Sequence, residues 1–473
     1  MRGTLLSLGN VFGQQLLRLA GNVVTTRLLF PEAYGLMVYV LIVMQGLQMI
    51  SDIGIVPSIV QHERGEERSF LDTAWTIQIA RGALITALAL LLAWPMAQAY
   101  GHAELTALIA VASIQGVVIG LDSTKLGTLN RRLQLGRLVL VNLAGQLVTL
   151  VVMVAWAYLA PSVWALLGGA IAGDATRLVM SHLALPGPRD RLRWEREAAR
   201  HIYHFGKWIF LSTLVTYLGL RFDMMALGAL VDPETLGVYN IGQSLAGVPV
   251  IVTGQIVSWV LLPALSESYR GDRDSFLRKV RRARRVINAG GVLMVAGTAI
   301  CAPAFFYLVY DERYHAAGWM VQLLMPATWF YFLQETSVRV QLAMGDSRAQ
   351  MLANLAKLGC TAPSAIGGFL LGRVYLGSGI AGLVLGLAVG AFAGYAAVAW
   401  MLRGRGLPIF LGDLRWTALG LAIALLGGYG PWALAPLVGV EAPIVSMIVG
   451  ALVIGPYALW SVRLVLRELR PRR

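Results

Sequence analysis

Two apolar stretches of this sequence each carry an arginine within a stripe of polar side chains. Both stripes have a spacing of four residues, and their members are Gln14, Arg18 and Asn22 in one stretch and Thr213, Tyr217 and Arg221 in the other. Residues four apart share one face of an α-helix. Neither arginine has a carboxylate three or four residues away, so each charge must be met by another helix, by water or by an anionic substrate. The alternative is that both arginines only bond carbonyls or amide side chains of neighbouring helices.

Other polar residues in the apolar stretches are weaker candidates for a cavity. Arg81, with Gln78 one turn away, has no acid nearby on its own helix and is a candidate cavity residue. Asp223 faces away from Arg221 and is expected to hold its helix to a neighbour or to act in gating. A further set could hydrogen-bond sugar hydroxyls or simply join helices: Gln45, Gln48, Asp52, Asn240 and Gln243.

Three acid–base pairs lie within single predicted helices, at spacings of three or four residues. They are Asp122 with Lys125, Asp174 with Arg177, and Glu335 with Arg339. Such pairs can neutralise themselves on one helix face, which favours local pairing or a cytoplasmic gate. Asp122 and Glu335 occupy comparable places in the fourth and tenth predicted spans. A role in gating, or in proton or sodium coupling with Asp52, therefore stays open.

The elements that position these residues are predicted membrane spans. The chain is 57% apolar and 14% charged, with a mean hydropathy of +0.67, which excludes an ordinary soluble domain. Apolar runs long enough to cross a hydrocarbon core recur along its length. We predict an all-α membrane protein with about 14 transmembrane helices, near 4–29, 34–60, 69–98, 104–128, 136–159, 161–185, 204–229, 235–262, 286–309, 316–343, 350–372, 379–402, 413–434 and 443–465.

The sequence also repeats itself at a distance of about 200 residues. P-E-A-Y-G at 31–35 returns as P-E-T-L-G at 233–237, and R-G-E-E-R-S-F-L at 64–71 returns as R-G-D-R-D-S-F-L at 270–277. Duplicated sets of six spans are typical of transporters, with the solute moving between the halves. The repeat predicts a six-helix lobe at 1–185, a basic linker at 186–203, a second six-helix lobe at 204–403, and two further helices with a basic tail at 404–473.

The net charge of +14 is concentrated in the connections on one side of the predicted spans. The richest of these connections are 189–200 and 270–285, and the C-terminal tail is basic as well. The positive-inside rule places them, and both termini, in the cytoplasm. The basic charge therefore indicates insertion and contact with anionic lipid, and no nucleic-acid partner is predicted. The stretch 191–204 is either an interfacial helix or a solvated linker.

Motifs for catalysis are missing from the sequence. It has no glycine-rich phosphate loop, no metal-ligand spacing and no nucleophile elbow, and its external connections are short. We therefore predict a protein that is not an enzyme, with no cofactor and no metal. A multidrug exporter remains an alternative, although it should carry unpaired carboxylates for cationic drugs. A membrane glycosyltransferase or polymerase is a second alternative that lacks the expected external domain.

Three segments resemble a known family of transporters. Residues 26–36, residues 221–228 followed by 236–239, and residues 70–82 are similar to the Wzx-like oligosaccharide flippases of the polysaccharide transport family. This family belongs to the multidrug/oligosaccharidyl-lipid/polysaccharide superfamily. The third segment most resembles the exopolysaccharide branch that includes the colanic-acid flippase.

The resemblance implies a fold, a substrate and a mechanism. The fold would be MATE-like, with two pseudo-symmetric six-helix lobes around a central cavity plus two C-terminal helices. The substrate would be an undecaprenyl-pyrophosphate-linked oligosaccharide, carried by alternating access to the periplasmic leaflet of a bacterial inner membrane for exopolysaccharide or O-antigen synthesis. A polysaccharide polymerase or export machinery is an implied partner. Arg18 and Arg221 would offset the pyrophosphate charge.

Overall fold

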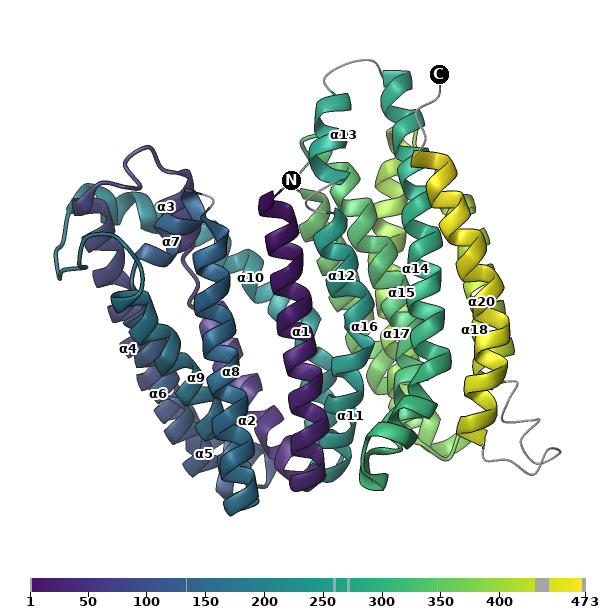
Figure 1. Ribbon diagram of the computed structural model, residues 1–473, viewed down its shortest axis with the longest axis horizontal. Helices are drawn as coiled ribbons and strands as arrows, with labels where there is room; N and C mark the ends of the chain where they lie inside the picture. Colours follow the sequence, from purple (N-terminus) through teal and green to yellow (C-terminus); the bar gives the residue numbers. More distant parts are fainter. Residues whose placement is uncertain are drawn as a thin grey trace. The chain divides into compact units, whose positions relative to one another are not determined.

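The computed structural model describes residues 2–132, 134–257, 261–269, 273–346, 348–429 and 442–469, and within these ranges it is helical, with no strand. The chain forms two compact units, 1–237 and 238–473. Each unit consists of helices that run alongside one another (Figure 1). The all-α prediction is confirmed. The predicted lobe boundaries at 185 and 204 stay predictions; the first compact unit extends further because α10 packs on α2 and α4.

The first unit contains ten helices that lie wholly within its described residues. They are α1 (Arg2–Leu28), α2 (Pro31–Ile50), α3 (Ile55–Gln61), α4 (Arg68–Tyr100), α5 (Glu104–Ala112), α6 (Ile114–Gly120), α7 (Lys125–Arg131), α8 (Leu135–Leu159), α9 (Val163–Leu183) and α10 (Arg196–Leu230). α1 packs against α8, α8 against α9, and α4 against α5 and α6.

The second unit begins at Val238, within α11, whose first turn belongs to the first unit. Its helices are α11 (Pro233–Ala246), α12 (Val248–Ile256), α13 (Leu262–Tyr269), α14 (Arg273–Val309), α15 (Ala317–Ala343), α16 (Arg348–Tyr375), α17 (Gly379–Gly404), α18 (Phe410–Ala424) and α20 (Ala442–Leu469). Short turns of 3-10 and π helix occupy Glu312–Tyr314 and Leu425–Tyr429. α14 lies between α15 and α20 and packs on both (Figure 1).

Eleven helices among the described residues are long and apolar enough to cross a membrane, or twelve if the bent pair 104–120 and 125–131 is one span. This is a multi-pass membrane protein, but the predicted count of 14 is not confirmed. Two further predicted spans fall on α1 and α15, each 27 residues long. Glutamines and charged residues lower the hydropathy of these two helices.

The repeated P-E-x-x-G motifs contact each other. Each proline begins a helix, as the sequence predicts. A Cβ atom added to Gly35 would lie 1.8 Å from the carbonyl oxygen of Pro233, and one added to Gly237 would lie 1.9 Å from that of Pro31. The two glycines therefore allow α2 and α11 to touch backbone to backbone at their first turns.

The segment before α10 is extended and hydrogen-bonded to α4. The backbone amides of three alternate residues donate to side chains of α4, namely Arg191 to Asp72, Arg193 to Thr76 and Glu195 to Thr73, each at 3.0 Å. No separate interfacial helix forms at 191–204, because Arg196 already begins the 35-residue α10. The first part of this stretch is instead an extended connection that is fixed along α4.

A buried charge network lies in the second unit, where the sequence predicted a basic loop. α14 begins at Arg273, so most of the expected connection 270–285 is helical. The guanidinium of Arg284, 6% exposed, donates to Asp413 at 2.5 Å and to Ser337 at 2.9 Å. Asn288 and Tyr395 also donate to Asp413, at 2.9 and 2.7 Å. The carboxylate of α18 thereby holds α14 and α17, while Arg284 also bonds α15.

We predict that Gly35→Ala lowers the stability of the protein. The added methyl group has no room beside the carbonyl of Pro233, and overpacking of this kind costs about 1–3 kcal/mol. Gly219→Ala is the matched control, because no atom lies within 4 Å of its added Cβ in the same unit. There alanine should be neutral or stabilising by up to about 1 kcal/mol. Thermal unfolding midpoints of the purified variants in one detergent test this, and equal midpoints would contradict the close contact.

Candidate functional site

The polar stripe on α10 faces α2 and donates hydrogen bonds to it. The contacts are Thr213 Oγ1 to the carbonyl of Met49 at 2.9 Å, the Tyr217 hydroxyl to the carbonyl of Ile42, and Arg221 Nη2 to Gln45 Oε1 at 2.6 Å. Tyr217 is 2% exposed, and Gly46 gives its ring room, since an added Cβ would lie 2.9 Å from the hydroxyl. In this structure the stripe therefore joins two helices, and substrate contact by Tyr217 and Arg221 stays a prediction.

The polar stripe on α1 is placed differently. α1 packs on α8, where an added Cβ on Gly21 would lie 2.9 Å from Leu150. Gln14 and Asn22 are half-buried, and Gln14 has an interaction partner. Arg18 is exposed and makes no hydrogen bond or ion pair to a described residue. Its guanidinium is therefore available to a ligand.

Arg81 of α4 reaches the end of α2. Its Nε donates to Ser51 Oγ at 3.1 Å and its Nη2 to the carbonyl of Gln48 at 2.6 Å. Asp52 lies 4.0 Å from Nη1, and it also accepts a hydrogen bond from the backbone amide of Gly54 at 2.9 Å. The structure thus brings together Arg81 and Asp52, two candidates that the sequence did not pair.

The predicted local pairs of Asp122 and Asp174 are replaced by contacts between helices. Asp122 pairs with Arg177 of α9 at 3.3 Å, and Asp174 accepts a hydrogen bond from Gln115 at 3.0 Å. Lys125 instead donates to backbone carbonyls. The prediction was wrong for Asp122 because the chain bends by 57° between α6 and α7, which takes Lys125 off the face of a continuous helix.

The bend is supported by one side chain and three glycines. Gln78 Nε2 of α4 donates to the last carbonyls around α6, those of Ile119, Gly120 and Asp122, at 2.9–3.3 Å. An added Cβ on Gly82 would lie 2.5 Å from the carbonyl of Gly116 and 2.8 Å from Cα of Gly120. Two glycines four residues apart are the sequence signal for such a close helix contact.

Arg81, Asp122 and Arg177 line one cavity of 160 Å³ in the first unit, together with Gln48 and Gln78. Asp122 is 5% exposed, and its Oδ1 atom and the Nε atom of Arg177 are buried without a hydrogen-bond partner among the described residues. Water or the hydroxyl groups of a ligand can satisfy both atoms. Sequence reasoning found Arg81 and Asp122 but missed Arg177, whose partner lies 55 residues away on another helix.

The other acidic candidates are engaged elsewhere. Glu335 pairs with Arg339 at 3.2 Å, which confirms the predicted pairing within α15, and Gln350 lies 3.5 Å from its second oxygen. Asp223 is 8% exposed and has an interaction partner. Neither residue lines the cavity around Asp122.

Residues 24–318, more than half of the chain, match the sequence profile of a family described as "Polysaccharide biosynthesis protein". The chain belongs to this family. Curated proteins with similar sequences include the teichuronic acid biosynthesis protein TuaB of Bacillus subtilis strain 168, 22% identical over 315 residues. That alignment covers 63% of this chain and 62% of TuaB. The amylovoran biosynthesis protein AmsL of Erwinia amylovora is 20% identical over 270 residues, 57% of this chain and 69% of AmsL.

The chain thus spans less than two thirds of the length of TuaB. Its fold is similar to that of solved transporters over a greater length. The lipid II flippase MurJ in an inward closed conformation matches with a TM-score of 0.70 at 13% identity, covering 98% of this chain and 99% of MurJ. An inward-facing MATE multidrug transporter of the MOP superfamily matches with a TM-score of 0.65 at 16% identity, covering 86% and 95%. The predicted MATE-like fold is confirmed.

We predict that Asp122 and Arg177 are energetically coupled. Arg177→Gln leaves a buried carboxylate without its cation and should destabilise the protein by about 1–3 kcal/mol. Asp122→Asn in the same background should restore part of the loss, because both substituted side chains then end in neutral carboxamides. Unfolding midpoints of both single variants and the double variant give the coupling. Additive effects, within about 0.5 kcal/mol, would contradict it.

Proposed function

We propose that this protein is a flippase for undecaprenyl-pyrophosphate-linked oligosaccharides in the bacterial plasma membrane. Membership of a polysaccharide biosynthesis family and a fold similar to MurJ support this proposal. The observation that carries it is that neither Arg18 nor Arg221 bonds a carboxylate among the described residues. Two cations on apolar helices are thereby left for an anionic substrate.

The proposal follows from the physics of moving a pyrophosphate through hydrocarbon. A buried charge is costly unless an opposite charge or several hydrogen bonds meet it. Arginine suits this role, since its planar guanidinium can bind two phosphate oxygens at once. The sugars would use the cavity around Arg81 and Asp122, whose unsatisfied atoms match hydroxyl groups. The polyprenyl chain would stay in lipid.

The charges also distinguish this function from drug export, which the similarity to MATE proteins would otherwise favour. A site for cationic drugs needs a carboxylate that is not already neutralised. Here Asp122 and Glu335 are both paired with arginines, at 3.3 and 3.2 Å. Asp174 accepts a hydrogen bond from Gln115 at 3.0 Å and interacts electrostatically with Arg177. Arg18 and Arg221, in contrast, have no carboxylate partner among the described residues. An anionic substrate fits this distribution.

The proposal includes a topology and a mechanism. Both termini would be cytoplasmic, and two six-helix lobes would open alternately toward each face of the membrane. Asp52, Asp122, Asp223 and Glu335 would act in gating or ion coupling. A polymerase or export complex would receive the product.

We predict that Arg18→Ala and Arg221→Ala each reduce polysaccharide export in a strain that depends on this gene. Loss of a charge-assisted contact to phosphate costs about 1.5–3 kcal/mol, which is roughly a tenfold to hundredfold loss of affinity. Arg18→Lys should retain part of the export, because it keeps the positive charge but loses the planar guanidinium that can bind two phosphate oxygens. Exported polymer is measured at equal protein level in the membrane.

Two controls separate charge from packing. Gln45→Leu removes the hydrogen bond to Arg221 but keeps the guanidinium, so export should persist if the charge is what matters. Arg200→Ala removes an exposed arginine at the start of α10 and should have no effect. Near-normal export by both Arg18→Ala and Arg221→Ala would refute the proposed role of these charges.

A further inference from the structure

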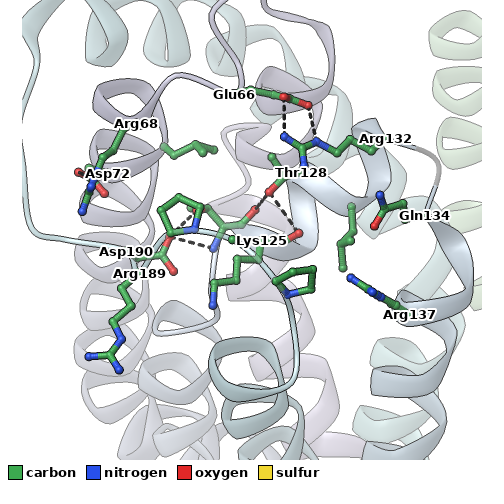
Figure 2. Close-up of a pocket in the computed structure, with 16 residues that line it drawn as sticks. Glu66, Arg68, Asp72, Lys125, Thr128, Arg132, Gln134, Arg137, Arg189 and Asp190 are labelled. Carbon is green, nitrogen blue, oxygen red and sulfur yellow. Dashed lines mark hydrogen bonds and ion pairs between the residues drawn. The ribbon is translucent and has the colours of Figure 1, made fainter.

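A second pocket, separate from the cavity around Asp122, lies where two membrane spans of the first unit begin. Its walls come from the first turns of α4 and α8, from α7, and from the extended segment 186–190 after α9 (Figure 2). The pocket has a volume of 140 Å³. Because α4 and α8 are candidate spans, their first residues lie at the level where hydrocarbon meets water.

The pocket is lined by more cations than carboxylates. The cations are Arg68, Lys125, Arg132, Arg137 and Arg189, and the carboxylates are Glu66, Asp72 and Asp190. The lining therefore carries a net charge of +2. A concave cationic surface of this kind attracts anions.

All three carboxylates are already engaged. Glu66 binds the guanidinium of Arg132 at 2.8 and 2.9 Å, and Asp72 lies 3.9 Å from Arg68. Asp190 accepts hydrogen bonds from the hydroxyl of Ser123 at 2.5 Å and from the hydroxyl and the amide of Thr124. The charges of Arg132 and Arg68 are thus neutralised. Asp190 instead accepts from uncharged hydroxyl and amide donors.

Lys125 is buried in the pocket without a carboxylate partner. It is 6% exposed, and its ammonium donates to the carbonyls of His182 at 2.8 Å and Leu185 at 3.2 Å. No carboxylate among the described residues lies within 4.0 Å of it. Gly187, with φ +139°, packs against the lysine stem, since a Cβ atom added to it would lie 3.4 Å from Cγ of Lys125. Burying an ammonium group without a counter-ion is unfavourable, and an anion in the pocket would offset that cost.

Two exposed arginines flank this lysine. Arg137 reaches in from α8 and Arg189 lies on the opposite side of Lys125 (Figure 2). Neither makes a hydrogen bond or an ion pair to a described residue. Arg137 points toward the other lining side chains, so its donors remain available to oxygens of a ligand, whereas Arg189 points away from them (Figure 2).

We propose that this pocket binds a phosphoryl group, with Lys125 and Arg137 as its ligands. At about 30 Å³ per water molecule the volume corresponds to roughly five waters, which is room for one tetrahedral phosphoryl group. The phosphoryl group comes either from the headgroup of an anionic phospholipid or from free phosphate. This inference does not rest on the proposed transport function, because its readout is binding alone.

The test is a titration of the purified full-length protein in a neutral detergent. The probes are dihexanoyl phosphatidylglycerol, dihexanoyl phosphatidylcholine and inorganic phosphate, with the dissociation constant measured by thermophoresis. We expect Arg137→Gln and Lys125→Gln each to weaken binding of the anionic probe by about tenfold, the effect of losing one charge-assisted hydrogen bond. Arg200→Gln, an exposed arginine of the same unit, should leave it within about twofold.

The outcomes distinguish the two sources. Binding of phosphatidylglycerol that depends on Arg137, without competition by inorganic phosphate, identifies a lipid headgroup, and competition by inorganic phosphate identifies free phosphate. If Arg137→Gln binds both anionic probes as well as Arg200→Gln does, or if phosphatidylcholine binds equally well, the proposal is overturned. Should Lys125→Gln fail to fold, Arg137→Gln still decides, because that side chain is exposed and bonds no described residue.

Discussion

The cost of placing charges and unpaired polar atoms in hydrocarbon governs this structure. Inside a membrane each such group must find a partner within the protein, in water or on a ligand. Several charges within the described spans meet this requirement through a side chain of opposite charge. Asp122 pairs with Arg177 and Arg284 with Asp413 on neighbouring helices, and Glu335 pairs with Arg339 on its own helix. Groups without such a partner among the described residues therefore indicate where a ligand or water binds. Arg18 and the orphaned atoms around Asp122 mark the places where a ligand or water is needed.

The two candidate sites of the first unit use different chemistry. The cavity around Arg81, Asp122 and Arg177 is lined by two arginines and one carboxylate and has unsatisfied hydrogen-bonding atoms, which suit water or hydroxyl groups. The pocket around Lys125 has excess positive charge at the ends of the spans, which suits phosphate. The bend between α6 and α7 separates them, because it turns Asp122 to one side and Lys125 to the other. One break in one span thus creates two environments.

The sequence predicted the features that are local or periodic. Helical class, most span positions, the repeated proline turns and the Glu335–Arg339 pair all follow from spacing along the chain. Contacts between distant segments could not be predicted in this way. The stripe at Thr213 and Tyr217 indicated a polar helix face, but its partners are backbone carbonyls of α2, which leave no pattern in the sequence. Arg284 was assigned to a loop, although Phe276, Val280 and Asn288 share its four-residue spacing and its burial.

The contact between Arg284 and Asp413 bears on how the chain can vary in evolution. Two apolar helices in lipid gain little from the hydrophobic effect when they associate, so a polar bond can decide where an added helix attaches. Here the carboxylate that pairs with the buried Arg284 is Asp413 of α18, one of the last helices of the chain. Loss of the terminal helices would leave the buried guanidinium of Arg284 without its carboxylate partner. The last segments are consequently integral to this protein, and their loss in a shorter homologue would require a compensating replacement at position 284.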